Sequence, residues 1–487
     1  MVKVYGHYIN GKSAKSDSKK TFQVINPSNK KVLAKFQLGT KKDVHKAVAV
    51  ALQSYKKWLS VPAPKRGEIL LEIASILKKR KQQLGKLEST EMGKILQEGL
   101  GDVQEAIDVF EYMAGEGRRL FGHTTPSELS HKTCYTLRQP LGVVGLITPW
   151  NFPIAIPAWK IAPALICGNS IVFKPSSDTP ICAYELVKIC EEAGVPKGVI
   201  NIVTGSGSEV GTEIIKHPKI RGISFTGSRA VGEFVTQNAG LKKVGLELGG
   251  KNPIVIMEDA DLNLALEGVI FGAFGTTGQR CTASSRIIIH KKIFKEFEEK
   301  LLKATKKLKV GNPLISSTNV GPLINKSAVE KTHKYTLIGK KEKAKLLCGG
   351  EPLSTKGFFY KPTIFTNVKP SMHIAQEEIF GPTTALIKVN NLKEAINFCN
   401  NVDYGLSASI YTNNITNAHL FIEKVESGIA YVNAPTIGAE VHLPFGGIKN
   451  TGNGTREAGI EGIHEFSETK TVYIDYSNRL QKAQGIK

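Results

Sequence analysis

The chain has 487 residues, and at roughly 150 residues per domain this length predicts about three domains. Its 41% hydrophobic and 22% charged residues are typical of a folded globular protein and exclude a disordered chain. The formal net charge of +22, from 65 Lys and Arg against 43 Asp and Glu, raises the question of a polyanionic partner such as nucleic acid.

The cysteines and the apolar segments indicate where the protein works. Seven cysteines, without a C-x-x-C pair and without histidines at metal-ligand spacing, predict a reducing compartment and no metal site. Residues 1–20 have no apolar run of the signal-peptide kind, and prolines and Lys160 interrupt the most apolar stretch, 141–173. We therefore expect a soluble, cytoplasmic protein with no membrane partner.

The N-terminal third has the periodicity of amphipathic helices. Apolar residues from Val44 to Trp58 recur at i, i+3, i+4 and i+7, and residues 69–87 repeat this pattern with Lys and Arg on the opposite face. Basic runs such as 78–81 and 340–341 are spread over every region of the chain. Because nucleic-acid-binding proteins gather such residues on one face with interleaved aromatics, that function class is disfavoured and we expect no nucleic-acid partner.

Residues 141–251 alternate short apolar runs with helical segments. Repeated strand–helix–strand units predict a parallel sheet covered on both faces, with ligands bound outside the carboxyl ends of its strands. The loops at those ends are rich in Gly, Pro, Ser and Asn. The expected strands are 143–147, 170–173, 199–203, 222–225 and 244–248.

From Asn252 onward, a second series of alternating elements predicts a second α/β domain. Near the end of the chain, residues 468–475 form a β-rich strip. An unpaired strip of this kind at a sheet edge is suited to pairing with another subunit.

Three residues at predicted turns have the chemistry of a catalytic site. Cys281 adjoins Arg280, and a neighbouring cation lowers the pKa of a thiol and favours the nucleophilic thiolate. Glu247 ends an apolar strand, where burial raises the pKa of a carboxylate and suits a general base. Asn151 lies between two prolines, which place its amide to donate to an oxyanion. Taken singly, each also fits a structural role as buried thiol, ion-pair partner or turn residue.

Together, and in their order along the chain, these and further motifs resemble the aldehyde dehydrogenase family. The resemblance runs from Ile9 to Val472 and implies an α/β fold with a Rossmann-type cofactor domain, an α/β catalytic domain and a small β oligomerisation arm. The matching segments are 149–153 (PWNFP), 174–175 (KP), 225–228 (FTGS) with Gly232, 247–251 (ELGGK), 278–281 (GQRC), 377–382 (EEIFGP) and 444–447 (PFGG).

The resemblance also divides the chain into parts. It implies a dinucleotide-binding domain formed by 1–121 and 141–250 and a catalytic domain formed by 251–449. The oligomerisation strands would be 122–140 and 465–487, and they imply a homodimer or a homotetramer.

The reaction implied by this resemblance is oxidation of an aldehyde to a carboxylic acid. Cys281 would attack the carbonyl, and the Asn151 amide with the backbone N–H of Cys281 would hold the oxyanion of the thiohemiacetal. After oxidation to a thioester, Glu247 would activate the water that hydrolyses it. Family members that transfer the acyl group to coenzyme A lack this glutamate, so Glu247 indicates the hydrolytic branch.

The implied cofactor is NAD or NADP. Lys174 would contact the adenosine ribose, Gly227 and Ser228 the pyrophosphate at a helix N-terminus, and Glu378 the nicotinamide ribose. The other cofactor residues implied by the resemblance are Pro149, Trp150, Gly207, Gly211, Phe225, Gly232, Leu248 and Phe380.

One departure from the family pattern concerns the cofactor. Many NAD-preferring relatives carry a glutamate where this chain has Ser177. Its absence removes repulsion toward a 2′-phosphate, and both Lys174 and nearby Arg229 add positive charge. We predict that NADP is accepted and leave open whether it is preferred.

The substrate would be a small-molecule aldehyde. The resemblance places Phe152, Trp159, Arg280 and Phe445 around the aldehyde tunnel, although aromatic residues there also serve packing. Segments 154–160 and 433–440 are most similar to the branch that oxidises short semialdehydes, 2-oxoglutarate semialdehyde (2,5-dioxopentanoate) in particular. Succinate semialdehyde, glyceraldehyde and simple aliphatic aldehydes stay open as alternatives.

Overall fold

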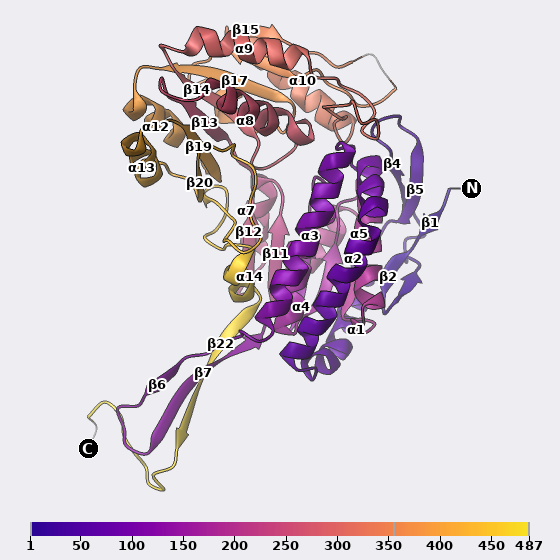
Figure 1. Ribbon diagram of the computed structural model, residues 1–487. Coiled ribbons are helices and arrows are strands. Elements are labelled where there is room, and N and C mark those ends of the chain that lie inside the picture. The colour runs from indigo at the N-terminus through magenta and orange to yellow at the C-terminus, as the bar shows by residue number, and fades with distance from the viewer. Residues whose placement is uncertain (1, 354–355, 486–487) are drawn as a thin grey trace.

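The computed structural model describes residues 2–353 and 356–485 and has two α/β bodies and a projecting β arm (Figure 1). Residues 1, 354–355 and 486–487, which belong to the predicted domain and arm ranges, lie outside the described residues. The predicted N-terminal amphipathic helices are confirmed, and they bury their apolar faces in the cores. They are α1 (Lys41–Leu59) and α2 (Ala63–Glu91). The helix α3 (Leu96–Glu116) follows them, and a small sheet of β1 (Val4–Tyr5), β5 (Val32–Gln37) and β4 (Thr21–Ile25) precedes them.

Among the described residues, the first large sheet has the strand order β12-β11-β8-β9-β10-β2-β3. The strands from β12 to β10 are parallel and their central residues are fully buried, which explains their continuous apolar runs. They are β8 (Val143–Ile147), β9 (Ser170–Lys174), β10 (Ile200–Ile202), β11 (Gly222–Thr226) and β12 (Lys243–Glu247), with β2 (His7–Ile9) and β3 (Lys12–Ala14) added antiparallel at one edge. The connecting helices are α4 (Ala155–Cys167), α5 (Pro180–Glu192), a π-helical turn (Gly207–Gly211) with α6 (Thr212–Lys216), and α7 (Arg229–Asn238).

The direction of winding in this sheet reverses beside β8. The chain runs from β8 through β9 to β10, and then returns to the other side of β8 with β11 and β12. Such a switch point leaves a crevice at the carboxyl ends of the two strands that flank it. The register pairs Ile147 with Phe225 and Thr226 with Glu247, so the loops after β8, β11 and β12 emerge at one edge.

The second large sheet, as far as the chain is described, has the order β15-β16-β17-β14-β13-β19-β20. Apolar strands at its centre pack against helices on both faces, as the sequence predicts for a second α/β domain. Its strands are β13 (Asn252–Ile256), β14 (Ser284–His290), β15 (Lys345–Cys348), β16 (Thr363–Thr366), β17 (Thr383–Val389), β19 (Ser407–Tyr411) and β20 (Ile429–Val432). Its helices are α8 (Leu262–Phe274), the short 3₁₀ turn η2 (Gly275–Gly278), α9 (Phe294–Lys306), α10 (Lys326–Lys341), α11 (His373–Gln376), α12 (Leu392–Asn400) and α13 (Ile415–Lys424).

The arm projects from the first body and carries the C-terminal end of the described chain (Figure 1). β22 (Ser467–Asp475) pairs antiparallel with β7 (Lys132–Pro140), which also pairs with β6 (Thr124–Pro126). The predicted β-rich strip is therefore a strand, and Tyr473 and Ile474 on it are exposed. The remaining elements are α14 (Gly459–Glu465) before β22 and the pair β18 (Tyr404–Gly405) and β21 (Ile448–Lys449). Within the described part of the chain, no helix combines the length and apolarity needed to cross a membrane.

Candidate active site

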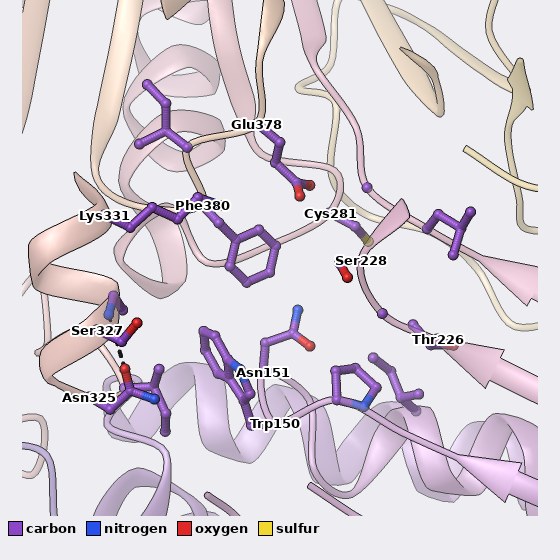
Figure 2. Close-up of a pocket in the computed structure, with 18 residues that line it drawn as sticks. Trp150, Asn151, Thr226, Ser228, Cys281, Asn325, Ser327, Lys331, Glu378 and Phe380 are labelled. Atoms are coloured by element: carbon purple, nitrogen blue, oxygen red, sulfur yellow. Dashed lines mark hydrogen bonds between the residues drawn. The ribbon is translucent and has the colours of Figure 1, made fainter. Parts of the chain in front are cut away.

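A pocket of about 300 Å³ lies between the two bodies, at the switch point of the first sheet (Figure 2). The first body lines it with the turns after β8, β11 and β12, at 149–151, 226–228 and 248–249. The second body contributes Cys281, the start of α10 and the loop 378–380. The pocket thus brings together motifs that lie up to about 230 residues apart in the chain.

Cys281 follows a turn whose backbone is tightly constrained. Gly278 has φ +69°, and a Cβ there would lie 2.2 Å from the carbonyl oxygen of Gly381. The carbonyl oxygen of Cys281 accepts a hydrogen bond from Asn252 Nδ2 at 2.7 Å. These contacts fix the backbone that presents the Cys281 thiol to the pocket.

The acidity of Cys281 differs from the sequence prediction. Burial, followed by the charges of Glu378 and Glu247, raises the pKa of the thiol to about 12. The prediction that Arg280 lowers this pKa is wrong, because the guanidinium lies 3.4 Å from Glu98 and donates through Nε to the hydroxyl of Thr276. The positive charge of Arg280 is matched by Glu98 rather than offered to the thiol.

Asn151 lies across the pocket from Cys281 (Figure 2). Its side chain is 3% exposed, and Nδ2 donates one hydrogen bond to the carbonyl oxygen of Gln279 at 3.0 Å. An amide nitrogen carries two hydrogens, so one N–H remains for a ligand oxygen in the pocket. The bond to Gln279 also joins Asn151 to the turn that carries Cys281.

Glu247 ends β12 and is 4% exposed. It lies just outside the lining of the pocket, and its Oε1 packs against Gly446, where a Cβ would approach to 2.6 Å. Burial and the neighbouring carboxylate Glu457 raise the pKa of Glu247 well above its usual range, while the ammonium of Lys160 opposes this rise. The predicted direction of the pKa shift is confirmed.

Two aromatic side chains, Trp150 and Phe380, and the carboxylate of Glu378 also line the pocket. Trp150 and Phe380 meet edge to face at 5.5 Å between ring centroids. Glu378 Oε1 accepts the backbone N–H of Gly250 at 3.0 Å, and a Cβ at Gly249 would lie 2.7 Å from the Glu378 carboxylate. The two glycines of the ELGGK segment therefore allow this carboxylate to approach the backbone closely.

The turn between β11 and α7 supplies further pocket residues. Gly227 donates its N–H to the carbonyl oxygen of Glu247 at 3.0 Å, and Ser228 is the N-cap residue of α7. Gly232 packs against Leu248, since a Cβ there would lie 2.6 Å from a Leu248 methyl group. The backbone N–H groups at this helix N-terminus are suited to an anionic group such as a pyrophosphate. Phe225 lies beneath Gly227 and is buried.

Lys174, Ser177, Gly207 and Gly211 lie at the neighbouring strand ends, outside the lining of the pocket. Burial lowers the pKa of Lys174 to about 8, and its Nζ donates to the carbonyl oxygen of Pro175 at 3.2 Å. Gly211 leaves room beside the Lys174 side chain, where a Cβ would lie 3.6 Å from Cδ. Ser177 Oγ donates to the carbonyl oxygen of Gly205 at 3.2 Å, and a Cβ at Gly207 would meet open space.

Arg229 is already paired. Its guanidinium lies 2.8 Å from Glu233 and 2.7 Å from Asp403. The interaction with Asp403 ties the first turn of α7 to the loop before β18. We therefore do not count Arg229 among the cations that face Ser177.

The four predicted substrate residues fall into two contact groups. Phe152 lies between two cations, with Lys94 Nζ 3.7 Å and the Arg280 guanidinium 5.2 Å from its ring centroid. Trp159 and Phe445 pack edge to face at 5.0 Å. The indole Nε1 of buried Trp159 has no hydrogen-bond partner among the described residues.

Some pocket residues have no counterpart in the sequence prediction. Ser327 and Lys331 reach the pocket from α10, which begins at the cap of Asn325, whose Oδ1 accepts the Ala328 N–H at 3.0 Å. Thr226 and Gly249 also line the pocket; they belong to the FTGS and ELGGK segments, but the resemblance implies no individual role for them. An Asn N-cap followed by an amphipathic helix is a sequence signal for α10. That signal gives no indication that Ser327 and Lys331 lie at a pocket.

Comparison with known proteins shows which family carries these motifs. The model of the aldehyde dehydrogenase family matches residues 14–472. Alpha-ketoglutaric semialdehyde dehydrogenase of Bacillus subtilis is 42% identical over 477 residues, which cover 96% of this chain and 98% of that protein. 2,5-Dioxopentanoate dehydrogenase of Saccharolobus solfataricus is 41% identical over 455 residues, 92% of this chain and 95% of that protein.

A solved structure extends the similarity to the fold. Betaine aldehyde dehydrogenase from Staphylococcus aureus in complex with NAD+ matches with a TM-score of 0.96 at 34% identity. The match covers 99% of this chain and 97% of that one.

Proposed function

The chain belongs to the aldehyde dehydrogenase family and is an NAD(P)-dependent aldehyde dehydrogenase, and we propose that it oxidises a short semialdehyde through Cys281. The observation that carries this proposal is that one pocket of about 300 Å³ contains the Cys281 thiol, the Asn151 amide and the Glu378 carboxylate together. The thiol, amide and carboxylate suit nucleophilic attack, oxyanion binding and cofactor binding, respectively.

In the first half of the proposed reaction, Cys281 forms a bond with the aldehyde carbon. The thiol gives its proton to solvent as sulfur attacks, and the carbonyl oxygen becomes the oxyanion of a thiohemiacetal. The free N–H of Asn151 and the backbone N–H of Cys281 donate to this oxygen. Because both donors are held before the substrate arrives, each contributes about 10²- to 10³-fold to the rate.

The residues that line the pocket match the chemical groups of a nicotinamide dinucleotide. Ser228 caps α7, whose first backbone N–H groups can receive a pyrophosphate, and Glu378 presents a carboxylate that can accept ribose hydroxyl groups. When it is bound, NAD(P)+ supplies the two-electron oxidation that converts the thiohemiacetal into a thioester. The rings of Trp150 and Phe380 also line the pocket and contact each other edge to face.

In the second half, Glu247 takes a proton from water, whose oxygen attacks the thioester carbon. The carbon–sulfur bond breaks, the carboxylic acid leaves, and the proton held by Glu247 passes to sulfur, which restores the Cys281 thiol and the Glu247 carboxylate. Burial raises the pKa of Glu247, which makes its carboxylate a stronger proton acceptor than an exposed glutamate. Glycine at 446 allows Oε1 to approach the backbone closely, since a Cβ there would lie 2.6 Å from it.

For the cofactor, we propose that both NAD and NADP are accepted. Ser177 has no charge to repel a 2′-phosphate, and Lys174 lies at the end of the adjoining strand. Arg229 does not contribute, because Glu233 and Asp403 hold it.

For the substrate, 2-oxoglutarate semialdehyde is the leading proposal. Two relatives that cover nearly the whole chain are named for this compound, under its two names. Succinate semialdehyde, glyceraldehyde and simple aliphatic aldehydes are the alternatives.

We also propose that the arm pairs with another copy of this chain, giving a homodimer or homotetramer. Leu137, Tyr473 and Ile474 on β7 and β22 are exposed, and β22 has no strand on its outer edge among the described residues. The seven free cysteines support a cytoplasmic location.

The test is a panel of aldehydes assayed at 340 nm with each cofactor, alongside Cys281→Ala and Glu247→Gln. We expect the highest kcat/KM for 2-oxoglutarate semialdehyde, activity with both cofactors, and none with Cys281→Ala. Glu247→Gln should release the first equivalent of reduced cofactor and then stall at the thioester. Turnover by Cys281→Ala would refute the mechanism. A tenfold higher kcat/KM for another aldehyde class would refute the assignment of 2-oxoglutarate semialdehyde as the substrate.

A further inference from the structure

The turn before Cys281 contains two residues in an unfavourable conformation. Thr276 has φ +50° and ψ 30°, and Thr277 has φ +58° and ψ 32°. β-Branched residues rarely adopt this left-handed region, because Cβ and the branch crowd the backbone. Such strain persists only where surrounding contacts hold the chain in place.

Glu98, on the first turn of α3, supplies the contacts that reach this turn from another element. Its Oε1 accepts the backbone N–H of Thr276 at 2.7 Å and lies 3.4 Å from Nη2 of Arg280. Arg280 in turn donates through Nε to the Thr276 hydroxyl at 2.9 Å. Glu98, Thr276 and Arg280 thus form a closed ring of polar contacts around the turn.

This ring is largely shielded from solvent. The side chains of Glu98 and Arg280 are 10% and 14% exposed, and the guanidinium packs near the rings of Phe152 and Phe271. A carboxylate in this setting strengthens each hydrogen bond that it accepts, because little water competes. Removing it would leave the Thr276 N–H and the Arg280 charge without their acceptor.

The turn also connects to the oxyanion donor. Gln279 follows Gly278 in this turn. Its backbone carbonyl oxygen accepts the hydrogen bond from the Asn151 amide, and its own side-chain amide donates to the Thr276 carbonyl oxygen at 3.2 Å. A shift of Thr276 would therefore move Cys281 and the amide that faces it. Displacements of about 1 Å between reacting groups can lower rates by about 10²-fold.

We propose that Glu98 is a positioning residue that holds the strained Thr276–Thr277 turn and so sets the Cys281 thiol against the Asn151 amide. This proposal rests on the proposed role of Cys281. It also assigns Arg280 to the support of the turn, with its charge matched by Glu98 before any substrate enters.

The test compares Glu98→Ala with Glu98→Gln, which keeps an oxygen able to accept the Thr276 N–H and loses only the charge. A third enzyme, Glu98→Ala/Thr276→Gly, places glycine where the backbone is left-handed, so that the turn keeps its shape without Glu98. Val103→Ala, which removes buried methyl groups from the same helix away from the turn, controls for lost stability. All are assayed with propanal and NAD+, and thermal unfolding is followed for each.

We expect Glu98→Ala to lower kcat about tenfold, with the KM for NAD+ within about twofold of the parent enzyme. Glu98→Gln and the double variant should each recover kcat by about threefold or more over Glu98→Ala. A loss below about fivefold, an equal loss in Val103→Ala, or failure of both rescuing variants would overturn the proposal. Cys281→Ala tests the proposed nucleophile independently of Glu98. Activity in that variant would refute the role of Cys281, whereas the Glu98 variants test only the positioning of the turn.

Discussion

The titration of Cys281 offers a quantitative test of the site. With a pKa of about 12 instead of about 9, the fraction of thiolate at pH 8 falls from about one in ten to about one in 10⁴. The free enzyme should therefore react with iodoacetamide about 10³-fold more slowly at pH 8 than an ordinary thiol would. Its rate should rise about tenfold per pH unit through pH 10, since only the thiolate reacts.

Glu378→Gln probes the cause of this shift. The Glu378 charge is the largest influence on the thiol after burial, and like charge disfavours the thiolate. Its removal should speed alkylation at every pH below 10, while the Gln oxygen can still accept the Gly250 N–H. Glu377→Gln is the matched control, because Glu377 accepts a hydrogen bond from the Tyr335 hydroxyl at 2.6 Å and is not among the main influences on the pKa of Cys281.

The assay measures incorporation of iodoacetamide into the peptide containing Cys281 from pH 7 to 10.5, without substrate or cofactor. Cys281→Ser supplies the background, because Cys348 is also partly exposed. A plateau in the rate at or below pH 9 would refute the raised pKa. Alkylation of Glu378→Gln at the same rate as the parent enzyme, or more slowly, would refute the electrostatic cause.

Three further predictions concern stability, rate and cofactor choice. Lys94→Met should destabilise the protein by about 3–5 kcal/mol in urea unfolding, because it leaves buried Glu88 and Asp102, at 2.6 and 2.9 Å, without their shared cation. A loss below about 1 kcal/mol would contradict this. Asn151→Ala should lower kcat about 10²- to 10³-fold with little change in the KM for cofactor, and an unchanged kcat would exclude it as oxyanion donor. Ser177→Glu should reduce kcat/KM for NADP about tenfold or more relative to NAD, and an unaltered ratio would place the 2′-phosphate elsewhere.

Much of the fold follows from local patterns. Strand periodicity and buried Val and Ile runs identified both parallel sheets, because fully buried strands need apolar residues on both faces. The rule that ligands lie beyond the carboxyl ends of such strands then selected the loops with Asn151, Gly227 and Glu247. The structure places these loops at one edge of the first sheet, by the register of β8, β11 and β12.

The sequence by itself therefore determined the fold class, the family and the motifs that meet at the pocket, because these depend on residue type and short-range spacing. Tertiary structure alone decided the charge environment. It paired Arg280 with Glu98 and Arg229 with Asp403, and it brought Lys331 to the pocket from α10. The pKa of Cys281 rose for the same reason, because burial and the partners of each charge depend on segments that pack from distant parts of the chain.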